Sequence, residues 1–277
     1  MKKFLALLFL IPVVAGYAQT FEGIINWKMA MEITDPKVKA QMEEAKKKMN
    51  DPATQAQMKQ MQEKMNDPEM KKLMESNPQI KASMEAAMKM QQGGGLESMM
   101  PKGITLKIKG HDLLTHTEGG AYNFDHLYLK DKKESYQINR EDKTYSKRTI
   151  KDEDLKGVTE QKDVKVTKTS ETQKIMGYTC TKYIVDLKEN NRDAQQFIWA
   201  TKEISNLDFK EFSRHTMTGN KNNTYYDQID GFPLKMEIKM ATGTMTMEVT
   251  EVKKESLPAS DFVIPSDYKE TKNVFGN

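Results

Sequence analysis

The sequence has little of several features that mark common classes of protein. It has one cysteine, Cys180, in 277 residues, so no disulfide can form within the chain. Beyond the first 18 residues, no apolar run approaches the roughly 20 residues that a membrane-spanning helix needs. The formal charge is only +3, and Lys2 and Lys3 supply two of these charges. A balance so close to neutral argues against a nucleic-acid-binding surface or a surface for anionic membranes.

Sequence signatures of catalysis are missing as well. The sequence contains no HExxH, GxSxG, P-loop or dinucleotide-binding motif. Cys180 lies between two threonines of a predicted strand, where a free cysteine is usually a small buried apolar residue. The histidines are scattered, and the five-residue spacing of His111 and His116 would place them on opposite faces of one strand. We therefore predict no enzymatic activity, no catalytic residues, no cofactor and no metal site.

The first 18 residues have the features of a signal peptide. Lys2 and Lys3 precede an apolar run from Phe4 to Val14, and small residues lie near Ala18, where cleavage is expected. No cysteine directly follows the apolar run, which argues against a lipid-anchored lipoprotein. The sequence thus predicts a periplasmic or secreted protein without a stable membrane anchor.

Residues 19–34 and 101–277 alternate between apolar and polar side chains, as half-buried strands do. Many short candidate strands with close turns predict an antiparallel sheet, and "NTYYDQI" at 223–229 is one of these candidates. A sheet of this kind has one covered or hollow face and one wet face. We expect the inner face to carry the apolar residues of the first strand and of the strand near 236, namely Trp27, Met29, Met31, Leu234, Met236, Ile238 and Met240.

Residues 35–100 differ in character from the rest of the chain. They contain no aromatic residue and are rich in Lys, Glu, Gln, Ala and Met, which favour helices. Four Asx-Pro pairs each offer an N-cap followed by proline at the first helical position. The pattern predicts short helices over 36–49, 52–65, 68–75 and 78–91, inserted between the first and second strands.

Methionines form narrow apolar stripes on these predicted helices. The stripes contain Met58, Met61 and Met65; Met70, Leu73 and Met74; and Ile80, Met84 and Met88. The stripes can pack on one another or on the sheet, they can form a pliable surface for varied apolar partners, or their thioethers can bind Cu(I).

The sequence resembles two known families in separate regions. Residues 67–84, "DPEMKKLMESNPQIKASM", are similar to the helical STI1-like repeats of co-chaperones, which implies a groove for client segments. Residues 171–187, 138–148 and 262–270 resemble an exported Bacteroidota family of unknown function with an I-x-G-Y-x-C-x-K-Y motif. In this chain the motif comprises Ile175, Gly177, Tyr178, Cys180, Lys182 and Tyr183. That resemblance implies a curved antiparallel sheet like that of the LolA/LolB lipoprotein carriers, so the expected fold class is α+β with a LolA-like half-barrel.

These observations lead to one functional hypothesis and two alternatives. We expect a non-enzymatic periplasmic protein that binds an apolar ligand, such as a lipid or acyl chain, or an apolar polypeptide segment of an exported client. The inner-face residues and the helix methionines named above would line the binding surface. The alternatives are a chaperone-like holdase that acts through the methionine-rich helices, and a methionine-based Cu(I)-binding protein.

Overall fold

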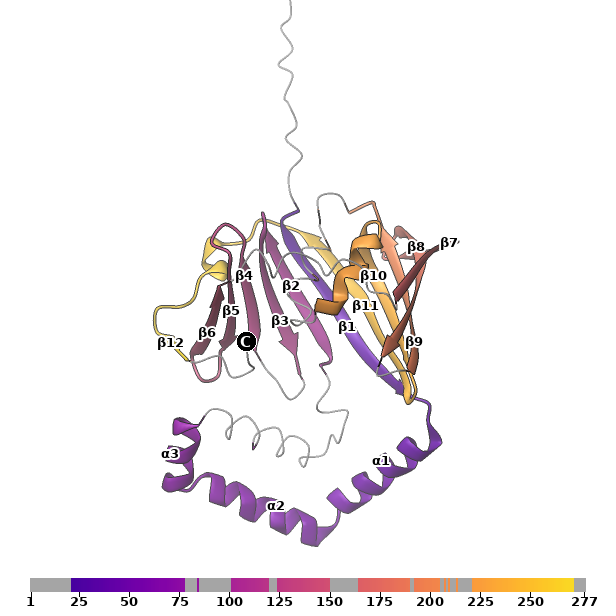
Figure 1. The fold of residues 1–277 in the computed structure, drawn as a ribbon. Coiled ribbons are helices and arrows are strands. Elements are labelled where there is room, and N and C mark those ends of the chain that lie inside the picture. Colours follow the sequence, from indigo (N-terminus) through magenta and orange to yellow (C-terminus); the bar gives the residue numbers. More distant parts are fainter. Residues whose placement is uncertain are drawn as a thin grey trace, which may run out of the picture.

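The fold is a single large sheet with a few helices beside it (Figure 1). We describe it from a computed structural model, which covers residues 21–77, 84, 101–119, 124–149, 164–189, 192–204, 207, 209, 213 and 221–271. The elements in chain order are β1 (Gly23–Ile33), α1 (Pro36–Met49), α2 (Pro52–Met65), α3 (Pro68–Ser76), β2 (Gly103–Lys109), β3 (Asp112–Glu118), β4 (Asp125–Leu129), β5 (Glu134–Asn139), β6 (Thr144–Thr149), β7 (Val164–Ile175), β8 (Tyr178–Glu189), β9 (Arg192–Thr201), η2 (Lys221–Gln228), β10 (Phe232–Met240), β11 (Gly243–Lys254), η3 (Ala259–Phe262) and β12 (Lys269–Glu270).

The sheet has twelve strands in the order β12-β6-β5-β4-β3-β2-β1-β11-β10-β9-β8-β7. Every pairing is antiparallel except the short contact of β12 with β6, which is parallel. The sheet is curved and does not close, so β7 and β12 are its two ends. This confirms the predicted antiparallel sheet and is compatible with an α+β half-barrel.

The helices between β1 and β2 begin where the Asx-Pro pairs predict. Asp35, Asp51 and Asp67 each accept hydrogen bonds from backbone N–H groups of the first turn that follows them. The predicted fourth helix, 78–91, lies outside the described residues apart from Met84, which is helical. In Figure 1, α1 to α3 form an arc beyond the ends of the strands, and none of their described side chains is buried. That residues 35–100 form a separate unit stays a prediction.

One predicted strand is wrong. The alternation at residues 223–229 predicts a strand, but residues 221–228 form the 3-10 helix η2. The reason is packing: the adjacent rings Tyr225 and Tyr226 are both buried, 6% and 5% exposed, whereas a strand would turn them to opposite faces. Their burial against the sheet therefore overrides the strand preference of tyrosine.

Two apolar clusters lie on opposite faces of the sheet. The first cluster lies on the inner face, mainly over β1, β2 and β7 to β11, and contains Ile25, Trp27, Ile198 and Leu234 among others. The second lies on the outer face of β3 to β6 and contains Leu114, Leu127 and Ile138. Strands β3 and β4 contribute to both clusters because their neighbouring residues point to opposite faces.

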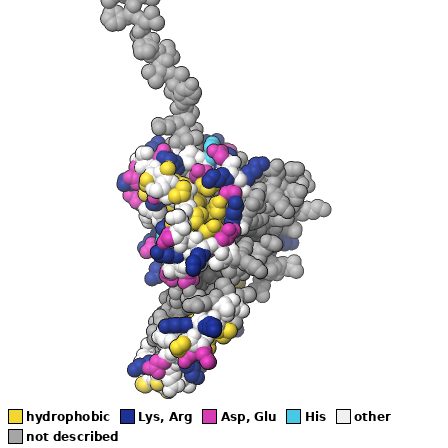
Figure 2. Space-filling model, turned by 90° about the vertical axis from the view of Figure 1, so that its left-hand side faces the viewer, with side chains coloured by type: hydrophobic (Ala, Val, Ile, Leu, Met, Phe, Trp, Pro, Cys, Tyr) yellow, Lys and Arg dark blue, Asp and Glu magenta, His cyan; other side chains and the backbone are white. Residues whose placement is uncertain are grey.

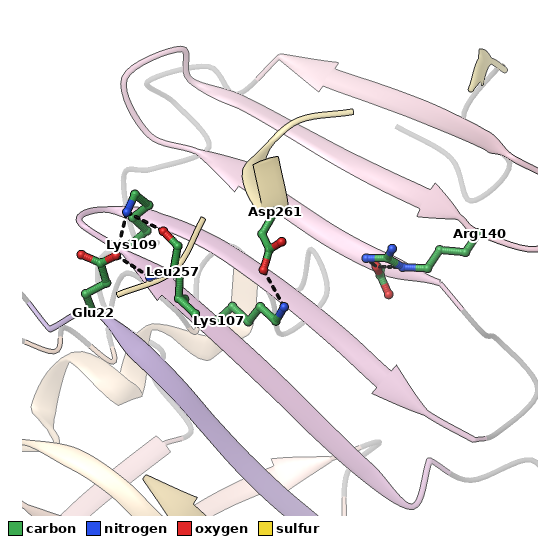
Figure 3. A network of polar contacts seen from close by, with 7 residues as sticks. Glu22, Lys107, Lys109, Arg140, Leu257 and Asp261 are labelled. Atoms are coloured by element: carbon green, nitrogen blue, oxygen red, sulfur yellow. Dashed lines mark hydrogen bonds and ion pairs between the residues drawn. The ribbon is translucent and has the colours of Figure 1, made fainter. Parts of the chain in front are cut away.

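The C-terminal strap, residues 255–271, covers the second cluster. Its Leu257 and Phe262 are 6% and 5% exposed, and its β12 residues pair with the edge of β6. Ion pairs and hydrogen bonds fasten the strap along its length (Figure 3). Lys109 Nζ contacts Glu22 Oε1 and the carbonyl of Leu257, each at 2.7 Å, and Lys107 Nζ lies 2.6 Å from Asp261 Oδ2.

The outer rim beside the strap shows a mixed surface. Viewed from the side of β6 and β12, hydrophobic side chains gather among charged ones (Figure 2). The partly buried apolar residues at this end of the sheet include Tyr145, Ile264 and Tyr268, and Val263 is 54% exposed. Beside them, Asp125 is 1% exposed and is paired with Arg140 and with His116 Nδ1, the latter at 2.6 Å.

Candidate ligand-binding surface on the inner face

Strand register brings the predicted inner-face residues of β1 and β10 together through β11, which lies between them. Met29 is opposite Met247, and Met31 is opposite Met245. On the other side of β11, Met247 is opposite Met236, and Met245 is opposite Ile238. Because cross-strand partners point to the same face, these side chains form two adjacent rows.

The inner face is closed at one end of these rows. Aromatic side chains pack over Trp27. The ring centroid of Phe232 lies 5.6 Å from that of Trp27, and the ring centroid of Phe209 lies 5.5 Å from that of Phe232. Phe209 also meets Tyr226 edge to face at 5.1 Å. In Figure 1, η2 lies in front of β1, β11 and β10, where this packing occurs. Trp27, Leu234 and Met236 are therefore part of a packed core, at 5%, 0% and 2% exposure.

The other end of the inner face is half-buried and apolar. We call it the methionine strip, made up of Met29, Met31 and Ile33 on β1, Ile238 and Met240 on β10, and Met245 on β11. Half-buried apolar side chains continue from it onto the outer strands, including Val164, Val166 and Leu187. Since Met29, Met31, Ile238 and Met240 are predicted binding residues, the strip brings four of them onto one accessible surface.

One polar side chain on this surface, among the residues that the structure describes, is Gln196. It lies in the row of Ile238, and its Oε1 accepts a hydrogen bond from the Tyr225 hydroxyl at 2.9 Å. Burial raises the pKa of Tyr225, so that hydroxyl stays protonated at neutral pH. Cys180 is fully buried in the same core, and burial raises the pKa of its thiol to about 11. A buried cysteine of this kind packs as a small apolar residue.

The helix methionines are placed differently. Met70 and Met74 on α3 are half-buried and flank Leu73, which is 46% exposed. Met84 is helical and half-buried, whereas Met88 and the side chains of Met58, Met61 and Met65 lie outside the described residues. The structure does not bring the described helix methionines onto the inner face of the sheet, and their role in binding stays a prediction.

Sequence reasoning missed two members of the inner rows, Met245 and Met247. The alternation in "GTMTMEVTEV" marks both as sharing one face of a strand. The missing signal is long-range: only the pairing of β1 with β11, more than 200 residues apart, shows that this face meets Met29 and Met31.

The inner face of β3 to β5 is mixed instead. Leu113 and Tyr128 are cross-strand partners in the first apolar cluster. Thr115, His126 and Gln137 lie in the next cross-strand row, and the buried Thr115 hydroxyl has no hydrogen-bond partner in the described part of the chain. His126 Nε2 lies 2.7 Å from the Ser135 hydroxyl. This half of the inner face therefore carries polar groups beside the apolar cluster.

A family model described as "Domain of unknown function (DUF4412)" matches residues 112–268, more than half of the chain. The chain belongs to the DUF4412 family. The matched region runs from β3 to the strap, so the DUF4412 region holds β10 and β11 of the strip, whereas β1 and α1 to α3 precede it. The predicted motif of Ile175 to Tyr183 forms the β7–β8 hairpin, whose tight turn has Met176 at φ +52° and Gly177 at φ +85°.

Comparison with curated proteins gives no match. Among solved structures, PNGF-II in a C2 crystal form is 18% identical at a TM-score of 0.37, over 61% of this chain. The chain spans only 28% of the PNGF-II chain. An uncharacterized conserved protein from Thermus thermophilus is 9% identical at a TM-score of 0.36, over 62% of this chain and 82% of that one.

LprF from Mycobacterium bovis is a third similar structure, 10% identical at a TM-score of 0.29, over 57% of this chain and 83% of that one. The DUF4412 family has no assigned function. The proposals that follow are therefore built on the residues of this chain.

Proposed function

We propose that this DUF4412 protein is an exported, non-enzymatic protein that binds an apolar ligand, such as a lipid or acyl chain, or an apolar polypeptide segment. The observation that carries the proposal is the methionine strip, where apolar side chains from three neighbouring strands stay half-buried beside a packed core. Export is proposed from the leader-like residues 1–18. Among the described residues, no helix is long and apolar enough to cross a membrane.

Methionine suits such a surface for a physical reason. Its unbranched side chain has three rotatable bonds and a polarizable sulfur, so it fits ligands of varied shape. Fully removing a side chain of this size from water contributes about 1.5–3 kcal/mol. The strip residues are already half-buried and association has its own entropic cost, so binding needs several of them to contact the ligand together.

The strip offers a matched pair of variants for the test. Met245 points to the inner face opposite Met31, whereas its neighbour Thr246 points to the outer face opposite Ala30. Met245→Lys places a charge in the strip, and Thr246→Lys places the same charge on the other side of the same strand. We expect Met245→Lys to weaken binding of the fluorescent probe N-phenyl-1-naphthylamine by about tenfold or more, since one lost apolar contact of about 1.4 kcal/mol has that effect.

The control should bind the probe within about twofold of the unaltered chain, because no apolar contact is lost on the outer face. Equal binding by all three proteins would overturn the proposal. A native mass spectrum of residues 19–277, purified from a periplasm without detergent, then identifies the natural ligand. Extra mass of a lipid that is lost on denaturation supports a lipid ligand, and a bare mass directs the search to a polypeptide client at Leu73 and its neighbours.

A further inference from the structure

The methionines of the three central strands all point the same way. Strands β1, β10 and β11 contain six methionines, and the register places every one on the inner face: Met29, Met31, Met236, Met240, Met245 and Met247. The residues between them on the outer face are mostly charged or threonine. Strand interiors usually favour β-branched and aromatic side chains. Six methionines on one face therefore indicate a need for flexibility or for sulfur.

Four of the six lie at the corners of a rectangle. Met29 and Met31 are two residues apart on β1, and their cross-strand partners Met247 and Met245 are two residues apart on β11. Cross-strand Cβ atoms are about 4.5–5.5 Å apart, and residues i and i+2 of a strand are separated by about 7 Å. A methionine side chain is long enough, and flexible enough, to bring its sulfur over the centre of such a rectangle.

The four methionines differ in burial. Met247 is 6% exposed and packs in the first apolar cluster, beside Met236. Met29, Met31 and Met245 are half-buried. One of the four side chains is thus fixed by packing, and the other three keep part of their surface exposed to solvent.

Thioethers are soft, uncharged ligands. They select Cu(I) over zinc, calcium and magnesium, which prefer imidazole, thiolate or oxygen ligands. The described residues contain no group of three or more His, Cys, Asp or Glu side chains able to hold a metal. The thiol of Cys180 does not compete, because it is buried and lies on β8, separated from β11 by β9 and β10.

We propose that Met29, Met31, Met245 and Met247 form a binding site for one Cu(I) ion on the inner face of the sheet. The site goes beyond the proposed binding of apolar ligands, because its ligand is a soft metal ion and its contacts are sulfur atoms. It also differs from a copper site on the helices, because its four methionines come from β1 and β11.

The site has a property that thiolate and imidazole sites lack. Cysteine, histidine and carboxylate ligands must lose a proton to bind a metal, so their affinity falls in acid. A thioether has no proton to lose. The affinity of the four-methionine site for Cu(I) should therefore be the same at pH 5 and at pH 8.

The test is an anaerobic titration of the mature chain with Cu(I) against the chelator bathocuproine disulfonate. We expect one Cu(I) per chain, with a copper-edge X-ray absorption spectrum that shows sulfur neighbours only. Met31→Leu with Met245→Leu should weaken binding about tenfold or more, whereas these volume-conserving changes should leave the chain folded. The matched control is Met70→Leu with Met74→Leu on α3, which should leave the affinity unchanged.

Several results would overturn the site. Loss of binding in the α3 variant but not in the sheet variant would move the copper to the helices. No stoichiometric Cu(I), a nitrogen or oxygen shell, or affinity that falls in acid would also refute it. Thermal unfolding of each variant separates a lost site from a lost fold. Binding of N-phenyl-1-naphthylamine is measured on the same samples, so failure of the copper site is distinguished from failure of the apolar-ligand proposal.

Discussion

The two faces of the sheet are closed in different ways. On the outer face of β3 to β6, the C-terminal strap seals an apolar cluster, and ion pairs such as Lys107–Asp261 and Lys143–Asp267 fasten it. On the inner face, aromatic side chains cover only part of the apolar surface, and the methionine strip stays half-buried. The strap closes the outer face with packed side chains and charge pairs of defined geometry. The methionine strip consists of flexible side chains, which suits the adaptable surface that we propose.

The strap should carry the largest single effect on stability. Phe262 is 5% exposed in the second cluster, so Phe262→Ala should cost about 3–5 kcal/mol through lost burial and the cavity left behind. Its neighbour Val263 is 54% exposed, and Val263→Ala should change stability by less than about 0.5 kcal/mol. Urea denaturation of both variants gives the difference. Similar midpoints for the two would mean that the strap does not seal the outer face.

On the inner face, the stability cost of removing a methionine side chain should differ between two positions of β11. Met247 is 6% exposed and lies in the core, so Met247→Ala should cost about 2–5 kcal/mol. Met245, two residues away on the same face, is half-buried, and Met245→Ala should cost about 1 kcal/mol because less area leaves water when it packs. Thermal unfolding in the absence of ligand is the measurement. Equal costs would show that the strip is as tightly packed as the core.

Acid should loosen the strap before it affects the strip. The hydrogen bond from Lys109 and the backbone N–H of Leu257 hold the pKa of the Glu22 carboxyl below its ordinary value. A lowered pKa in the folded state means that Glu22 stabilises the fold above its unfolded pKa of about 4.3, and that this stability is lost as the pH falls further.

The difference in urea midpoint between pH 7 and pH 3 should therefore be smaller in Glu22→Gln than in the unaltered chain. Glu32→Gln, at an exposed position of β1, is the control and should keep the full difference. An unchanged pH response in Glu22→Gln would assign the acid sensitivity to other carboxyl groups. Asp267 and Asp230 are the next to test, because lysine partners lower the pKa of each.

Local signals in the sequence predicted the elements of the fold well. Period-two alternation identified most strands, and Asp35, Asp51 and Asp67 before proline marked the starts of α1 to α3. The alternation in β1 also placed Trp27, Met29 and Met31 on one face, which the structure confirms. These predictions succeed because caps and alternation depend on neighbours in the chain.

Long-range packing could not be predicted in the same way. The sequence does not tell that residues 255–271 cross back over β3 to β6, or that η2 replaces a strand because Tyr225 and Tyr226 pack on the inner face. It likewise separates Met29 from Met247 by more than 200 residues, although they are cross-strand partners. The four-methionine site depends on this pairing: the sequence predicted Met29 and Met31 as binding residues and missed their partners Met247 and Met245.

The helices between β1 and β2 should matter least for stability. None of the described side chains of α1 to α3 is buried, and β1 and β2 are anchored on their own by Thr34 N donating to Thr242 O and Met29 N donating to Lys102 O. The last pair of β1 with β2 is at Lys28, and β1 continues for five more residues, or about 17 Å. A linker of about ten Gly and Ser residues in place of residues 36–100 is therefore long enough to connect the end of β1 to the start of β2.

The shortened chain should unfold within a few degrees of the full chain and keep the same near-ultraviolet circular dichroism, because both apolar clusters remain. Binding of N-phenyl-1-naphthylamine then divides two roles of the helices. Retained binding means that the strip is sufficient alone. Lost binding in a folded shortened chain means that residues 36–100 complete the surface. A shortened chain that no longer folds would instead show that residues 36–100 are needed for the fold. The comparison of the two faces would then have to include these residues as a third structural part.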